Sequence, residues 1–103
     1  MNVYRIDTFS VPPASRPDFE ASMRRSVAFL SALPGCRTAL VFEQTGGPSS
    51  FNVITLVEWE SEDAHRQAAA RVRAYYQEIG FDPLTTIQRL GVTAQLGDYR
   101  QAP

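Results

Sequence analysis

The stretch from Phe51 to Pro83 constrains the fold more than any other part of the chain. It alternates side chains in the period of a β-strand as far as Trp59, the only tryptophan. The pattern then changes at once to that of a helix, with Ser61 suited to cap its first turn and the only histidine, His65, close behind. We therefore expect Trp59 and His65 to mark one wall of a pocket.

Both faces of this predicted strand carry apolar groups, which is typical of a strand at the centre of a sheet. One face holds Phe51, Val53, Thr55, Val57 and Trp59. The other holds Asn52, Ile54, Leu56 and Glu58, so Asn52 is expected to face away from the pocket. The helix that follows has an apolar stripe and is expected to end at Gly80. That stripe consists of Ala64, Ala68, Val72, Tyr75 and Ile79.

The first half of the chain reads as strand, helix, strand. Val3 to Phe9 alternates as a strand. Ser15 and Asp18 then resemble a capping box, and a helical repeat of apolar residues follows as far as Pro34-Gly35. That repeat is Phe19, Met23, Val27 and Leu30.

The remaining elements complete a symmetrical order. Residues Cys36 to Gln44 are strand-like and are joined to the central strand by a Gly- and Ser-rich loop, which predicts a hairpin. A last strand is expected from about Ile87 to Tyr99, after Asp82-Pro83. The resulting order, β-α-β-β-α-β, predicts an α+β fold: a ferredoxin-like split unit with four antiparallel strands and two helices on one sheet face.

The predicted fold leaves one apolar sheet face uncovered. A single domain over residues 1–103 is expected, since 103 residues fall within the usual size of one domain. Two helices cover only one face of its sheet, and the other would present to water a larger apolar patch than monomers usually carry. We therefore expect a homodimer that pairs sheet to sheet.

Composition excludes several classes of function. A net charge of -1 offers no basic surface for nucleic acid. All ten basic residues are arginine, which rules out a lysine nucleophile, and the lone Cys36 rules out an intrachain disulfide or a multi-cysteine metal site. No metal cluster, phosphate-binding loop or hydrolytic triad is apparent. Without a signal-peptide pattern or an apolar run long enough to span a membrane, a cytoplasmic location is expected.

Three motifs, in this order, resemble the antibiotic biosynthesis monooxygenase family. They are Val11-Pro12-Pro13, Leu33-Pro34-Gly35 and Val57-Glu58-Trp59-Glu60-Ser61. The resemblance spans nearly the whole chain and implies a dimeric α/β barrel. It also implies oxidation of a small aromatic substrate, such as a phenol, quinol or anthrone, by molecular oxygen without flavin, metal or haem.

Three residues are candidates for catalysis. Asp7, on the polar face of the first strand, suits a base or a hydrogen-bond anchor for a phenol, although an ion pair with Arg5 or Arg89 is the alternative. His65 can accept a proton near neutral pH, or can lie on the helix surface. Tyr75 is expected to point inward and hold a substrate oxygen.

Five residues are expected to contact the substrate: Trp59, Phe51, Val57, Val72 and Tyr76. Trp59 resembles the tryptophan that lines the cavity of catalytic relatives, with plain core packing as its alternative. Tyr76 shares a side of its helix with His65. Haem-degrading relatives carry an axial histidine about ten residues beyond the tryptophan, where this chain has alanines, so no haem is expected. Those alanines are Ala68, Ala69 and Ala70.

Two further functions stay open. A cyclase or isomerase on the same scaffold would need an acid and a base but no oxygen. A non-catalytic dimer that binds a small hydrophobic metabolite would need neither.

Overall fold

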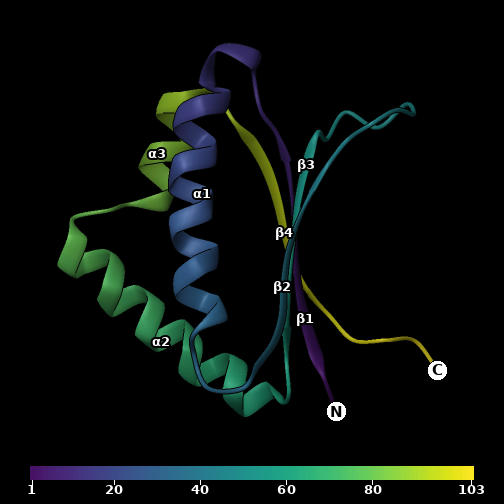
Figure 1. Ribbon diagram of the computed structural model, residues 1–103, viewed down its shortest axis with the longest axis vertical. Coiled ribbons are helices and arrows are strands. Elements are labelled where there is room, and N and C mark those ends of the chain that lie inside the picture. The colour runs from purple at the N-terminus through teal and green to yellow at the C-terminus, as the bar shows by residue number, and fades with distance from the viewer.

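The computed structural model describes all residues, 1–103, and its four strands form one antiparallel sheet in the order β2-β3-β1-β4. All helices lie on one side of this sheet and leave the other side bare (Figure 1). The ferredoxin-like fold predicted from the sequence is confirmed. The elements are β1 (Val3–Ser10), a short 3-10 helix (Pro13–Ser15), α1 (Arg16–Ser31), β2 (Cys36–Glu43), β3 (Val53–Trp59), α2 (Glu62–Ile79), α3 (Pro83–Leu90) and β4 (Thr93–Tyr99).

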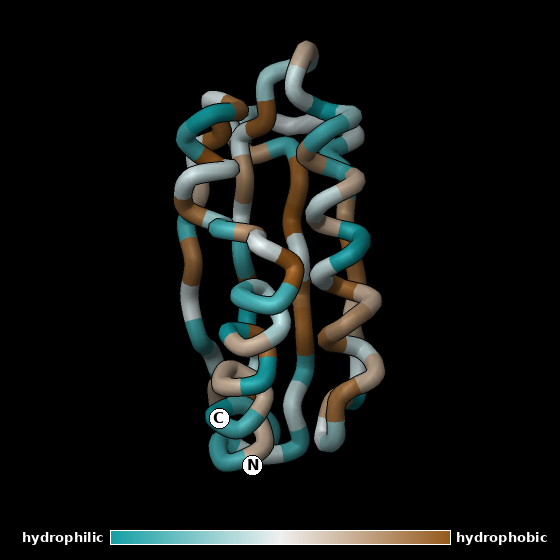
Figure 2. Tube along the Cα trace, turned by 90° about the vertical axis from the view of Figure 1, so that its left-hand side faces the viewer, coloured by the Kyte–Doolittle hydropathy of each residue, from teal (hydrophilic) through white to brown (hydrophobic).

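The helix-facing side of the sheet is packed at both ends. Strand β3 alternates buried and half-buried residues along its length, as its sequence predicts. One core cluster gathers around Val53 and Phe9, where the rings of Phe9 and Phe19 lie 5.0 Å apart. The second gathers around Trp59, which is only 1% exposed. Seen from the helix side, apolar stretches of the strands run behind and between the helices (Figure 2).

A third helix, α3, stands where the sequence analysis placed the start of the last strand. The prediction of a strand from Ile87 is wrong, because Pro83 to Leu90 is helical and β4 begins only at Thr93. Asp82 caps α3 by accepting hydrogen bonds from the backbone N–H groups of Leu84 and Thr85. Gly91 ends it with a left-handed φ of 69°. The sheet therefore carries three helices, not two.

The two predicted helix caps have different outcomes. Ser61 is extended and its side chain accepts a hydrogen bond from the N–H of Ala64 at 3.0 Å, which confirms the cap of α2. Ser15 has helical backbone angles, so it cannot turn its hydroxyl back onto α1, and the predicted capping box is wrong. Its Oγ instead donates to the carbonyl of Leu90 at 2.6 Å and ties α1 to the end of α3.

The bare face of the sheet is apolar at its centre. In the registered strands, Leu40 lies opposite Leu56 and Phe42 opposite Ile54. Leu40 and Phe42 are 45% and 47% exposed. None of the helices is both long enough and apolar enough to cross a lipid bilayer.

Candidate functional site: a cavity between sheet and helices

A cavity of about 450 Å³ lies on the helix-covered side of the sheet. Strands β1, β3 and β4 form its floor, and α1, α2 and α3 form its walls. Of its 23 lining residues 14 are hydrophobic, so a molecule bound there must be largely apolar.

The floor of the cavity carries a polar pair between two strands. Asp7 on β1 lies directly opposite Thr55 on β3, and both line the cavity. Val57 and Trp59 continue the same face of β3. Thr55 is the only buried polar residue of the chain. The floor therefore offers a ligand polar contacts at this point.

Asp7 is the only carboxylate in the cavity lining, with its side chain 18% exposed. Arg5 donates from Nε to Asp7 Oδ1 at 2.7 Å. Burial raises the pKa of the Asp7 carboxyl above its ordinary value, although Arg5 and the backbone N–H of Gly97 lower it in part. Burial also lowers the pKa of Arg5, but its bonds to Asp7 and Asp98 outweigh this and raise the pKa overall. A raised pKa brings a carboxylate closer to the basicity that proton abstraction at neutral pH requires.

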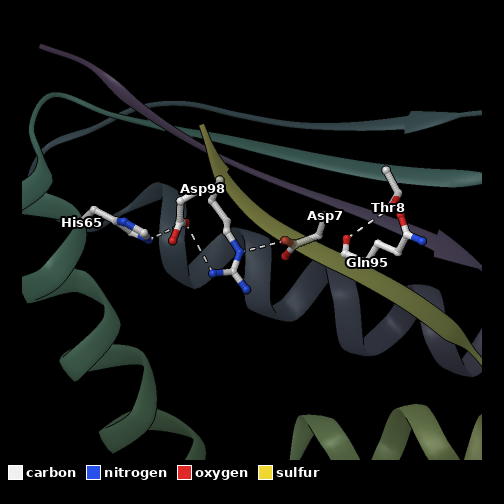
Figure 3. Close-up of polar contacts among 6 residues, drawn as sticks. Asp7, Thr8, His65, Gln95 and Asp98 are labelled. Atoms are coloured by element: carbon white, nitrogen blue, oxygen red, sulfur yellow. Dashed lines mark hydrogen bonds and ion pairs between the residues drawn. The ribbon is translucent and has the colours of Figure 1, made fainter. Parts of the chain in front are cut away.

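A line of charged groups leads from Asp7 to His65 (Figure 3). Asp98 on β4 has its Oδ1 3.5 Å from Arg5 Nη1 and 3.6 Å from His65 Nε2. The imidazole of His65 also stacks on Trp59, with ring centroids 6.0 Å apart and planes 21° apart. Thr8, next to Asp7 in the chain, points to the other face and donates to the carbonyl of Gln95. The structure thus gathers Asp7, His65 and Trp59 around one end of the cavity.

Helix α2 turns a different face to the cavity than its apolar stripe predicts. The residues that line the cavity from α2 are His65, Ala68, Ala69, Val72, Arg73 and Tyr76. Tyr76 donates from its hydroxyl to Ser26 Oγ on α1 at 2.8 Å. Four of the five residues expected to contact the substrate line the cavity: Trp59, Val57, Val72 and Tyr76.

Tyr75 lies outside the cavity, which corrects its predicted inward position. Its ring stacks on Phe29 of α1, with centroids 4.1 Å and planes 5° apart. Successive residues of a helix are turned by about 100°. Tyr75 and Tyr76 therefore point to different sides of α2: Tyr75 packs on α1 and Tyr76 lines the cavity.

Phe51 is the other expected contact that the cavity does not include. Strand β3 begins only at Val53. The side chain of Asn52 accepts from the N–H of Val11 and donates to its carbonyl, both at 2.9 Å. The side chain of Asn52 thus binds the segment that follows β1, and Phe51 lies in the segment before β3.

The cavity residues that the sequence analysis did not name as site residues include Thr55, Arg5 and Arg73. Thr55 carried a usable signal, since it lies four residues before Trp59 on the same face of a strand. Arg5 shares the face of Asp7 for the same reason and is the ion-pair partner that the sequence offered as an alternative. Arg73 follows His65 and Ala69 at successive intervals of four, a spacing that the predicted apolar stripe concealed.

The chain contains no group of three or more His, Cys, Asp or Glu side chains that could hold a metal ion. The one imidazole, His65, lies between Trp59 and Asp98. Asp7 and His65 are two cavity side chains suited to proton transfer.

Comparison with known proteins finds a family match over most of the chain. The sequence model described as antibiotic biosynthesis monooxygenase matches residues 2–77. No curated protein sequence matches the chain.

Solved structures extend the comparison at the level of the fold. A candidate monooxygenase from Shewanella loihica has 20% identity and a TM-score of 0.74, with 99% of this chain and 95% of that chain covered. SnoaB, a cofactor-independent oxygenase from Streptomyces nogalater, has 20% identity and a TM-score of 0.66, covering 99% and 94%. A mutant of MhuD with two manganese protoporphyrin IX molecules per active site has 19% identity and a TM-score of 0.70, covering 98% and 95%. Identities this low show a shared fold alone.

Proposed function

The chain belongs to the antibiotic biosynthesis monooxygenase family, and we propose that it oxidises an aromatic polyketide, anthrone or quinol with molecular oxygen and without a cofactor. The observation that carries the proposal is the Asp7 carboxylate on the floor of a mainly apolar cavity, paired with Arg5. A flat aromatic substrate fits such walls, and a phenolic or enolic oxygen would meet the base.

The proposed reaction begins with proton transfer. Asp7 takes the acidic proton of the substrate, and the resulting anion passes one electron to oxygen to form a substrate radical and superoxide. The two combine into a peroxide anion, which takes the proton back from Asp7, and the hydroperoxide then loses water and leaves one oxygen atom as a new carbonyl. Oxygen itself is the oxidant, so no further redox partner is required. The apolar walls exclude water from the radical pair.

The other polar residues have supporting roles in this proposal. Arg5 stabilises negative charge next to Asp7. Thr55 offers a hydroxyl opposite Asp7 to hold the substrate oxygen. His65, which lines the cavity beside Trp59, is the second group that can accept or return a proton.

Cofactor independence is part of the proposal because a protein of this fold binds a porphyrin. Its support is the placement of His65, whose ring stacks on Trp59 and whose Nε2 faces Asp98. Binding of haem iron by Nε2 of His65 would require His65 to give up its contact with Asp98. When haem is titrated into the protein, the Soret band should therefore stay at the position of free haem. A shift of the Soret band that is lost in His65→Ala would contradict cofactor independence.

Labelled oxygen tests the oxygenase activity. The protein is incubated with a panel of anthrones and quinols under ¹⁸O₂, and the masses of the products are measured by mass spectrometry. One labelled atom is expected in the product. Asp7→Asn should lower turnover by about 10² or more, while Asp18→Asn, at an exposed position on α1, serves as the matched control and should not.

Other outcomes of this experiment identify the alternatives. Turnover that persists under strict anaerobiosis would indicate a cyclase or isomerase. Tight binding of panel members without any turnover would indicate a non-catalytic protein for a small hydrophobic metabolite. Unlabelled products throughout would overturn the oxygenase proposal.

The assembly that we propose is a homodimer of single-domain chains. Support for one domain over residues 1–103 comes from the sheet, in which β1 and β4, from opposite ends of the chain, are paired. Support for the dimer comes from the apolar bare face, where Leu40 and Phe42 are nearly half exposed. A second sheet laid on this face would remove it from water.

A further inference from the structure

The cavity contains one cation that has no acidic partner. Its charged or titratable lining residues, apart from Tyr76, are Arg5, Asp7, His65 and Arg73. Asp7 is bonded to Arg5, and His65 faces Asp98. Arg73 takes part in none of the ion pairs of the chain. The lining therefore carries an excess of positive charge in a chain whose net charge is -1.

Arg73 lies at the opposite end of the cavity from the His65 cluster. Eight residues of helix separate Arg73 from His65, which is about 12 Å along the axis of α2. Helix α2 runs away from the sheet in this direction (Figure 1). Arg73 is exposed there, and Tyr76 and Phe81, with rings in edge contact at 5.0 Å, line the same region.

A second guanidinium adds to the positive charge of this region. The guanidinium carbon of Arg25 lies 4.9 Å from the centroid of the Phe81 ring. Arg25 also makes no ion pair. Both arginines thus lie close to the aromatic residues that line the outer end of the cavity, with no carboxylate of the chain to neutralise them.

We propose that Arg73 binds an acid group on the ligand, so that the substrate is an aromatic acid with its rings in the cavity and its anion at the mouth. A guanidinium presents a planar set of N–H donors that matches a carboxylate or sulfonate in two hydrogen bonds. In describing the ligand as a substrate, the inference rests on the proposed function. The binding that it describes does not depend on turnover.

Two dyes with the same ring skeleton test the inference. 1-Anilinonaphthalene-8-sulfonate carries an anion, and N-phenyl-1-naphthylamine is its neutral counterpart. Binding is followed by the ¹H–¹⁵N signal of the indole of Trp59, which reports on this cavity because Trp59 is the only tryptophan and lines it. Both dyes are expected to shift this signal.

Arg73→Gln should lower the affinity for the sulfonate dye about fivefold at low salt, which is the size expected for an exposed ion pair. Its affinity for the neutral dye should not change. Arg73→Lys should retain only part of the affinity, because it keeps the charge but not the two parallel hydrogen bonds. Arg71→Gln is the matched control: Arg71 is exposed on α2, does not line the cavity and makes no ion pair, so neither dye should respond.

Three outcomes would overturn the inference. They are an unchanged affinity of Arg73→Gln for the sulfonate dye, an equal loss for both dyes, and a Trp59 signal that the sulfonate dye does not shift. None of them concerns oxygen chemistry, so failure of this inference and failure of the proposed function are distinguishable.

Discussion

Asp7 links the ionisation of the cavity to the stability of the protein. Its pKa is raised by burial, so the folded chain holds the proton of Asp7 more tightly than the unfolded chain does. Ionised Asp7 therefore costs stability above its folded pKa, and this cost disappears as the pH falls below the ordinary aspartate value.

We expect Asp7→Asn to change the stability of the protein by an amount that depends on pH. The free energy of unfolding of the variant, relative to that of the natural chain, should increase as the pH rises through the raised pKa of Asp7. Urea unfolding at intervals from about pH 3 to pH 7 measures it. If this difference in free energy of unfolding instead decreased with rising pH, the interaction of Asp7 with Arg5 would outweigh the effect of burial on the pKa of Asp7.

The same ionisation predicts the acidic limb of the reaction. If Asp7 is the base, turnover of a responsive anthrone falls as Asp7 becomes protonated, and it does so at a higher pH than for an ordinary aspartate. The pH profile of kcat/KM measures this limb. A profile that is flat down to pH 4 would remove Asp7 from the role of base.

Tyr75 and Tyr76 form a matched pair for a test of packing. Tyr76→Phe deletes the hydroxyl that donates to Ser26, and should destabilise the protein by about 1 kcal/mol. Tyr75→Phe should have little effect, because the stacking of its ring on Phe29 is retained. Urea unfolding compares the two, and the loss in Tyr76→Phe should vanish in a Ser26→Ala background.

At the scale of elements, α3 depends on its ends. Asp82 accepts hydrogen bonds from the N–H groups of Leu84 and Thr85, and these bonds, with that from the Thr85 hydroxyl, lower the pKa of Asp82. The stabilisation is therefore present above the ordinary aspartate pKa and is lost as the pH falls through the lowered value.

Asp82→Ala should loosen α3 at neutral pH, whereas Asp82→Asn, which can still cap the helix, should do so much less. Hydrogen exchange of the amides of Thr86 to Leu90 measures the effect. Equal protection in both variants would mean that packing of Leu90 in the core, and not the cap, holds α3 in place.

At the scale of the whole molecule, the bare sheet face predicts the assembly. In size-exclusion chromatography with light scattering, the natural chain should have twice the 11.5 kDa mass of one chain. Phe42→Glu places a charge at the centre of the proposed interface and should give monomers.

Leu84→Glu is the matched control for this test. Leu84 is 66% exposed but belongs to α3, on the opposite side of the sheet from the proposed interface, so this variant should remain dimeric. A natural chain that is monomeric at micromolar concentration would contradict the sheet-to-sheet dimer.

Local patterns in the sequence are sufficient to predict the elements whose structure depends on residues only a few positions apart. The alternation of β3, the end of α2 at Gly80 and the cap at Ser61 all depend on neighbours within a few residues. The same is true of α3: its Asp82-Pro83 start and Gly91 end are visible in the sequence, although the pattern from Ile87 predicts a strand.

The sequence by itself determined the order of most elements, the fold class, and which residues share a face with Asp7 on one strand and with Trp59 on another, because periods of two and 3.6 residues decide which side chains share a side. Only the tertiary structure decided which side of α2 faces the cavity. That choice depends on how α2 leans against α1, and it turned Tyr76 and Arg73 toward the cavity and Tyr75 away from it. It also brought Asp98, near the end of the chain, between Arg5 and His65, since contacts between distant segments have no local signal in the sequence.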